Sequence, residues 1–162
     1  MSLATRIERL ARLVPGVAGY VDRERARDTD QRVRRRLAAE LVAIKRALEP
    51  VNRALVGAQD LAPLPALDRL GGKLDMLATT IEHAAHGYHG LFDGAPVGHA
   101  ELARLYDFDL RLFDDVRALS GHAGKIAEAV NDRPRLMDAI ARMEAALDRF
   151  ETTVAGRQRL LA

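Results

Sequence analysis

Cysteine and tryptophan are absent from this chain of 162 residues, and aromatic side chains make up only 4% of it. Without cysteine there can be no disulfide, no thiolate zinc site, no iron–sulfur cluster and no cysteine nucleophile. The absence also fits a reducing compartment, so we expect a cytoplasmic protein. The scarcity of aromatic rings disfavours the stacking platforms with which proteins read single-stranded nucleic acid.

Long hydrophobic runs are missing as well. No apolar stretch approaches the roughly 18 residues that a membrane-spanning helix needs, and charged residues interrupt the first 16 residues, so we expect neither a span nor a signal peptide. The two serines, Ser2 and Ser120, lack the surroundings of a serine nucleophile on a strand-to-helix turn. We therefore expect a protein that is not an enzyme and that needs no cofactor.

Charge is nearly balanced over the whole chain but unevenly distributed. The net charge is +2, yet residues 1–60 carry 13 Lys/Arg and 8 Asp/Glu, whereas residues 61–162 carry 12 and 15. The excess of arginine is concentrated in residues 23–36, which hold seven arginines and three acids. A local basic patch on a nearly neutral chain favours a solvated, partly self-paired helix face over a nucleic-acid footprint, so we expect no nucleic-acid partner.

Apolar residues recur at intervals of three and four along most of the chain, which is the pattern of helices that bury one face. Four such rows occur, the first in a helix expected over residues 22–56, in which Pro50 should produce a kink. No convincing stretch alternates with a period of two, so we expect no sheet. We predict an all-α fold, an antiparallel four-helix bundle of heptad-patterned helices that pack like a coiled coil. The rows comprise Leu37, Leu41, Ile44, Leu48, Val51 and Leu55; Leu67, Leu70, Leu74, Leu77 and Ile81; Leu102, Leu105, Asp109, Leu112, Val116, Leu119, Ala123, Ile126 and Val130; and Leu136, Ile140, Met143, Leu147, Phe150 and Val154.

The first 19 residues are predicted to form a separate region, a short amphipathic helix and a Gly-rich turn, ahead of a bundle over residues 20–162. We expect removal of residues 1–15 to leave thermal melting nearly unchanged, because all four rows begin after this region. The basic face of the short helix also suggests attachment to a membrane surface, which is a second hypothesis for the function. Its apolar stripe contains Leu3, Ile7, Leu10 and Val14.

Three histidines, His83, His86 and His89, stand at intervals of three beside Glu82 and raise the question of a metal site. On a helix they would fan across about 120°, whereas zinc sites take three or four ligands, usually with some from another segment. Glycines interrupt the helix where these side chains accumulate, and Glu-His-x-x-His differs from the His-Glu-x-x-His of metalloproteases. We interpret the stretch as a helix end and predict no metal ligand. A metal- or ligand-binding bundle that uses the three histidines is the alternative.

One charged residue, Asp109, occupies a position inside the third apolar row. Because a buried carboxylate is costly unless it is paired, this side chain should meet a cation. Tracing the first row backward from Leu37 reaches Arg34, Asp30 and Arg27, so this end of the bundle should have a polar interior. We predict a buried polar cluster of Arg27, Asp30, Arg34 and Asp109, in which Arg27 or Arg34 pairs with Asp109 and the role is structural rather than catalytic.

Three stretches also carry a resemblance to a known family: "PGVAGYVDRERARDTDQRVRRRLAAEL", "LDRLGGKLDMLATTIEHAAHGYHGLFD" and "ELARLYDFDL". Together they resemble a family of uncharacterised bacterial helical proteins, over about residues 13–112. Members of that family tend to be encoded beside SPFH proteins (stomatin, prohibitin and flotillin), so the resemblance implies a role in a membrane-associated assembly. The matching positions are Gly16, Gly19, Tyr20, Arg27, Asp30, Gly87, Tyr88, Gly90, Leu91, Phe92, Asp93, Tyr106 and Asp109.

The sequence therefore favours a non-enzymatic adaptor or accessory protein that binds another protein, in the cytoplasm or at the periphery of a membrane. Tyr88, Leu91 and Phe92, in a Gly-rich stretch, form the predicted interaction loop. The membrane-binding protein and the metal- or ligand-binding bundle stay open as alternatives.

Overall fold

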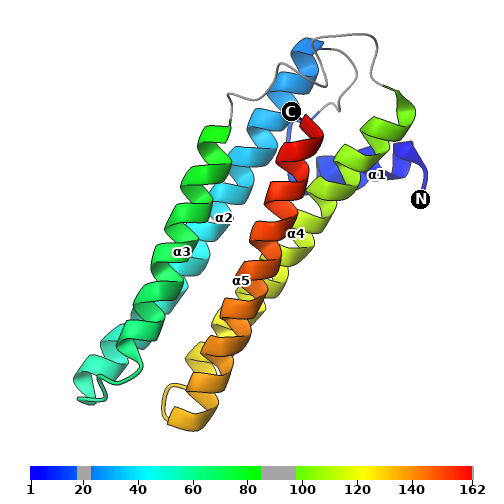
Figure 1. Cartoon of the computed structure of the whole chain (residues 1–162). Coiled ribbons are helices and arrows are strands. Elements are labelled where there is room, and N and C mark those ends of the chain that lie inside the picture. Colours follow the sequence, from blue (N-terminus) through cyan, green and yellow to red (C-terminus); the bar gives the residue numbers. More distant parts are fainter. Residues whose placement is uncertain (18–22, 85–97, 162) are drawn as a thin grey trace.

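The computed structural model describes residues 1–17, 23–84 and 98–161, and these residues form five helices and no strand (Figure 1). The helices are α1 (Leu3–Leu13), α2 (Arg23–Gly57), α3 (Leu64–His83), α4 (His99–Glu128) and α5 (Arg133–Leu161). The prediction of an all-α fold is confirmed for this part of the chain. Within the same residues, no helix combines the length and the apolarity needed to cross a membrane.

Side chains at the helix ends explain where two of the helices begin. The Ser2 Oγ accepts a hydrogen bond of 3.2 Å from the backbone nitrogen of Thr5 at the start of α1. Asp132 accepts one of the same length from the backbone nitrogen of Arg135 at the start of α5. Helix α2 does not end at Pro50 but continues through it over 35 residues. Side-chain caps thus mark the starts of α1 and α5, and α2 continues past its internal proline.

The apolar rows form one continuous core. Leu102 and Val130 are partly buried, and every other residue of the four predicted rows is buried. Helix α2 packs against α3 and α4, and α5 packs against the same two helices, so the contacts close a ring in the order α2, α3, α5, α4. Figure 1 shows these helices lying side by side along most of their length. The apolar row of each of these four helices therefore packs against two neighbouring helices.

Helix α1 docks against α4 near one end of that helix (Figure 1). Leu10 is fully buried and Val14 is 3% exposed, and both belong to the same hydrophobic cluster as the four rows. Arg6 donates hydrogen bonds of 2.7 and 3.1 Å to Asp107 of α4, and this bond above all lowers the pKa of the Asp107 carboxyl. The apolar stripe of α1 therefore packs into the common core, and this contact argues against the expectation that removal of residues 1–15 leaves melting unchanged.

Candidate functional site

Four charged side chains lie in the interior near one end of the helices. Asp30 and Asp109 are 0% exposed, Arg157 is 5% exposed and Arg34 is 7% exposed. They come from α2 (Asp30 and Arg34), α4 (Asp109) and α5 (Arg157). A buried charge is strongly unfavourable unless an opposite charge and hydrogen bonds compensate it. These four residues, called here the buried charge network, meet that condition.

Arg157 is the centre of the network. Its Nη2 donates a hydrogen bond of 2.7 Å to Asp30 Oδ1, and its Nε donates one of 2.6 Å to Asp109 Oδ1. The second oxygen of Asp30 accepts a bond of 2.5 Å from Arg34 Nε. Two guanidinium groups thus face two carboxylates, and the formal charges of the four groups cancel. The bonds join α2, α4 and α5 through short, charge-assisted contacts.

Arg34 extends the network to the fourth helix of the ring. Its Nη1 donates a hydrogen bond of 2.6 Å to the carbonyl oxygen of Glu82 and approaches that of Ile81 at 3.5 Å. Both carbonyls belong to the last turn of α3, where carbonyl groups lack partners within the helix and where a positive charge is favourable. The network therefore fixes the end of α3 against α2, α4 and α5.

The structure brings together three of the four residues expected in the cluster, namely Asp30, Arg34 and Asp109. Arg27, by contrast, is exposed. The buried row of α2 runs from Leu37 through Asp30 to Ala26, and one residue further along a helix turns the side chain by about 100°. Arg27 consequently points away from the row.

Arg157 is the member of the network that the sequence analysis missed. The fourth predicted row ends at Val154, its last apolar residue before a charged position. Continuing in the same steps of three and four reaches Arg157 and Leu161, and both are buried. The sequence signal that could have identified Arg157 is this continuation of the helical period past Val154, the last apolar residue of the predicted row. The hydrogen bond to Asp109 comes from this arginine rather than from the α2 arginines proposed from sequence.

The histidine stretch is only partly described by the structure. His83 is exposed at the last position of α3, with its Nδ1 3.0 Å from the carbonyl oxygen of Thr79. Within the described ranges, no group of three histidine, aspartate or glutamate side chains is placed to hold a metal ion. His86, His89 and the predicted interaction loop, Tyr88, Leu91 and Phe92, lie outside the described residues.

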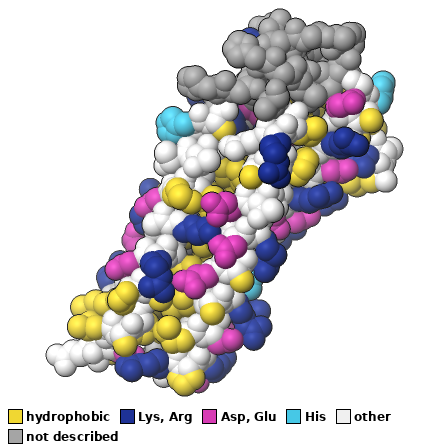
Figure 2. All heavy atoms as spheres, viewed as in Figure 1, with side chains coloured by type: hydrophobic (Ala, Val, Ile, Leu, Met, Phe, Trp, Pro, Cys, Tyr) yellow, Lys and Arg dark blue, Asp and Glu magenta, His cyan; other side chains and the backbone are white. Residues whose placement is uncertain are grey.

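Three exposed apolar side chains lie at the other end of the helices, where α2 ends and α3 and α5 begin. Val56 in the last turn of α2 is 55% exposed, Leu61 between α2 and α3 is 57% exposed, and Met137 near the start of α5 is 42% exposed. An ion pair between Arg133 of α5 and Asp60 draws the start of α5 to the α2–α3 connection. We call Val56, Leu61 and Met137 the end patch. Figure 2 shows hydrophobic side chains concentrated at this lower end of the viewed face.

Comparison of the chain with protein-family models, with curated proteins and with solved structures gave no match in any of the three.

Proposed function

We propose that this chain is a non-enzymatic adaptor or accessory protein, built as an antiparallel four-helix bundle, that binds another protein. The closed ring of contacts among α2, α3, α5 and α4 supports the bundle. So do the short connections at residues 58–63 and 129–132, because connections of this length join antiparallel neighbours. The buried charge network supports a structural use of the interior charges, since its groups bond to one another away from solvent.

The observation that carries the proposal is the end patch. Single exposed apolar residues are ordinary, but a group of them framed by polar residues is typical of a protein-binding surface. Leu61 and Met137 come from separate segments of the chain, and the Arg133–Asp60 ion pair joins these two segments. Methionine adapts its shape to different apolar partners, which suits a contact surface. Binding of another protein would bury these apolar side chains and remove them from water.

The family resemblance adds the kind of partner, a protein of a membrane-associated scaffold assembly. In this proposal the two ends of the bundle have different tasks. The buried charge network holds the four helices together at one end, and the end patch contacts the partner at the other. A rigid helical body between them presents the patch without rearrangement.

Affinity capture with matched surface variants tests the proposal. The tagged full chain is expressed in its native host, and the proteins recovered with it are quantified by mass spectrometry. Leu61→Ser and Met137→Ser each remove an exposed side chain of the end patch, whereas Met76→Ser removes one from the outer face of α3 that is 48% exposed. We expect both patch variants to lose the same partner protein and Met76→Ser to retain it. Equal recovery with all three variants would refute the assignment of the end patch.

A further inference from the structure

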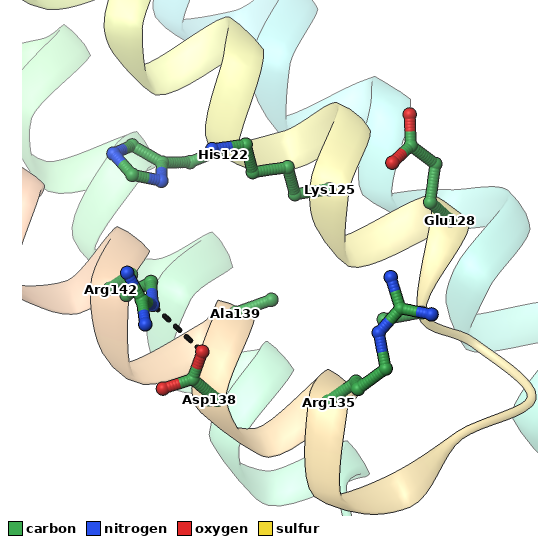
Figure 3. A pocket seen from close by; sticks show the side chains of 8 residues that line it. His122, Lys125, Glu128, Arg135, Asp138, Ala139 and Arg142 are labelled. Carbon is green, nitrogen blue, oxygen red and sulfur yellow. Dashed lines mark hydrogen bonds and ion pairs between the residues drawn. The ribbon is translucent and has the colours of Figure 1, made fainter.

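A groove separates the last third of α4 from the first third of α5. It encloses about 270 Å³ and is lined by His122, Lys125 and Glu128 on one side and by Arg135, Asp138 and Arg142 on the other. Figure 3 shows His122 and Lys125 of α4 on one side of the open space and Arg135, Asp138 and Arg142 of α5 on the other, whereas the Glu128 carboxylate points away from α5. The groove is large enough for a small ligand with several polar atoms. Its lining combines these charged and polar side chains with Ala129 and Ala139.

The cations in this groove outnumber the carboxylates that neutralise them. Asp138 forms an ion pair with Arg142, whose Nε donates a hydrogen bond of 2.7 Å to the carboxylate. Lys125 and Arg135 have no carboxylate partner among the described residues, although most basic side chains of the bundle do. With Glu128 as the remaining acid, the groove keeps a positive excess that an anion would offset.

His122 carries the second, independent sign of a missing ligand. Its Nδ1 is buried and has no hydrogen-bond partner among the residues that the structure describes. Burial lowers the pKa of this imidazole, and the positive charges of Lys125 on its own helix and of Arg149 and Arg142 on α5 lower it further. All three of these charges are positive, so each of them disfavours the protonated ring. An anion between these cations would remove the repulsion and supply an acceptor for a protonated ring.

We propose that the groove between α4 and α5 binds a small multivalent anion of the phosphate or phosphomonoester class, held by Lys125 and Arg135 with His122 as a further donor. Arginine and lysine are the usual ligands of phosphate oxygens, and two cations from facing helices can contact the oxygens from both sides. The site is separate from the end patch, so it adds a ligand to the protein whether or not the proposed partner is correct.

Histidine-detected NMR on the full-length chain tests the site. Inorganic phosphate is titrated at constant ionic strength against chloride, and the ring signals of His122 are followed after assignment with His122→Asn. We expect saturable shifts of the His122 signals and a rise of its titration midpoint in the presence of phosphate, because the bound anion favours the charged ring. Lys125→Gln with Arg135→Gln should weaken binding by about tenfold or more, as expected for loss of charge-assisted hydrogen bonds.

The control removes the same charge elsewhere. Arg46→Gln with Arg104→Gln changes two exposed arginines outside the groove and should leave phosphate binding unchanged. Equal weakening by both pairs of substitutions, or no saturable shift with phosphate, would overturn the proposal. A second titration uses phosphatidylcholine vesicles with and without phosphatidic acid. A response to phosphatidic acid alone, without one to free phosphate, would replace the small anion by a lipid headgroup and overturn the proposal as stated.

Discussion

Replacement of Arg157 by methionine is the sharpest perturbation of the buried charge network. The substitution keeps most of the side-chain length but removes hydrogen bonds of 2.7 and 2.6 Å to two carboxylates that are 0% exposed. Breaking a buried ion pair by removal of one partner costs about 3–5 kcal/mol, because the other charge stays buried without its compensation. Since whole domains are stable by only about 5–15 kcal/mol, Arg157→Met should remove a large share of the free energy of unfolding.

A double-mutant cycle separates the pair from the packing of the arginine stem. We expect Arg157→Met with Asp109→Leu to be more stable than the sum of the single variants predicts, with a coupling energy of about 2–3 kcal/mol. Urea unfolding followed by circular dichroism measures it, provided that the dependence on urea is similar among the variants. The Arg32–Asp28 pair serves as the control, because its distance of 2.8 Å is similar while the side chains are 47% and 54% exposed. Its coupling should stay below about 1 kcal/mol. Equal coupling in the two pairs would refute the reasoning that burial makes this network strong.

Three further predictions concern the helix ends and the docking of α1. Leu10→Ala should destabilise the protein by about 2–5 kcal/mol, and removal of residues 1–15 by at least as much, because Leu10 is fully buried; unchanged thermal melting of the truncated chain would mean that α1 does not share the core. The pKa of Asp107 is lowered by the bond from Arg6, so this carboxyl stabilises the fold at neutral pH and loses that contribution as the pH falls through its folded-state value. The difference in free energy of unfolding between the wild type and Asp107→Asn, measured by urea unfolding, should therefore become smaller as the pH is lowered. A difference that grows at low pH would contradict the pairing. His83→Ala should change the free energy of unfolding by less than about 1 kcal/mol, because the ring is exposed at a helix end. A larger loss of stability in urea unfolding would show that the His83 ring makes a stabilising contact.

The helices themselves were predictable because a period of three and four apolar residues is a long-range, redundant signal. The position of Asp109 illustrates how far the signal extends: the row predicted an inward carboxylate, and the side chain is 0% exposed. The identity of its arginine was harder to predict. That arginine is Arg157, which is reached only when the α5 row is continued past Val154 through a charged position. On α2, steps of three and of four are both compatible with a helix, so the row could pass through Arg27 or Ala26.

The parts that depend on tertiary contact were not predictable in the same way. The stripe of α1 that contains Leu10 would suit a membrane surface as well as a helix, because burial of apolar area is non-directional. The end patch and the groove each combine residues from segments far apart in the chain, such as Leu61 with Met137 and Lys125 with Arg135. No local pattern marks such pairs before the helices are placed side by side.

Photo-crosslinking from the end patch tests the central proposal most directly. A photoreactive amino acid is placed at Leu61 in one variant and at Met76 in another, both exposed in the structure, and the cells of the native host are irradiated before lysis. If the end patch binds a partner, the variant with the probe at position 61 forms one dominant crosslinked species and the variant with the probe at position 76 does not. Crosslinks of equal yield from both positions, or none from position 61, would contradict the proposed function.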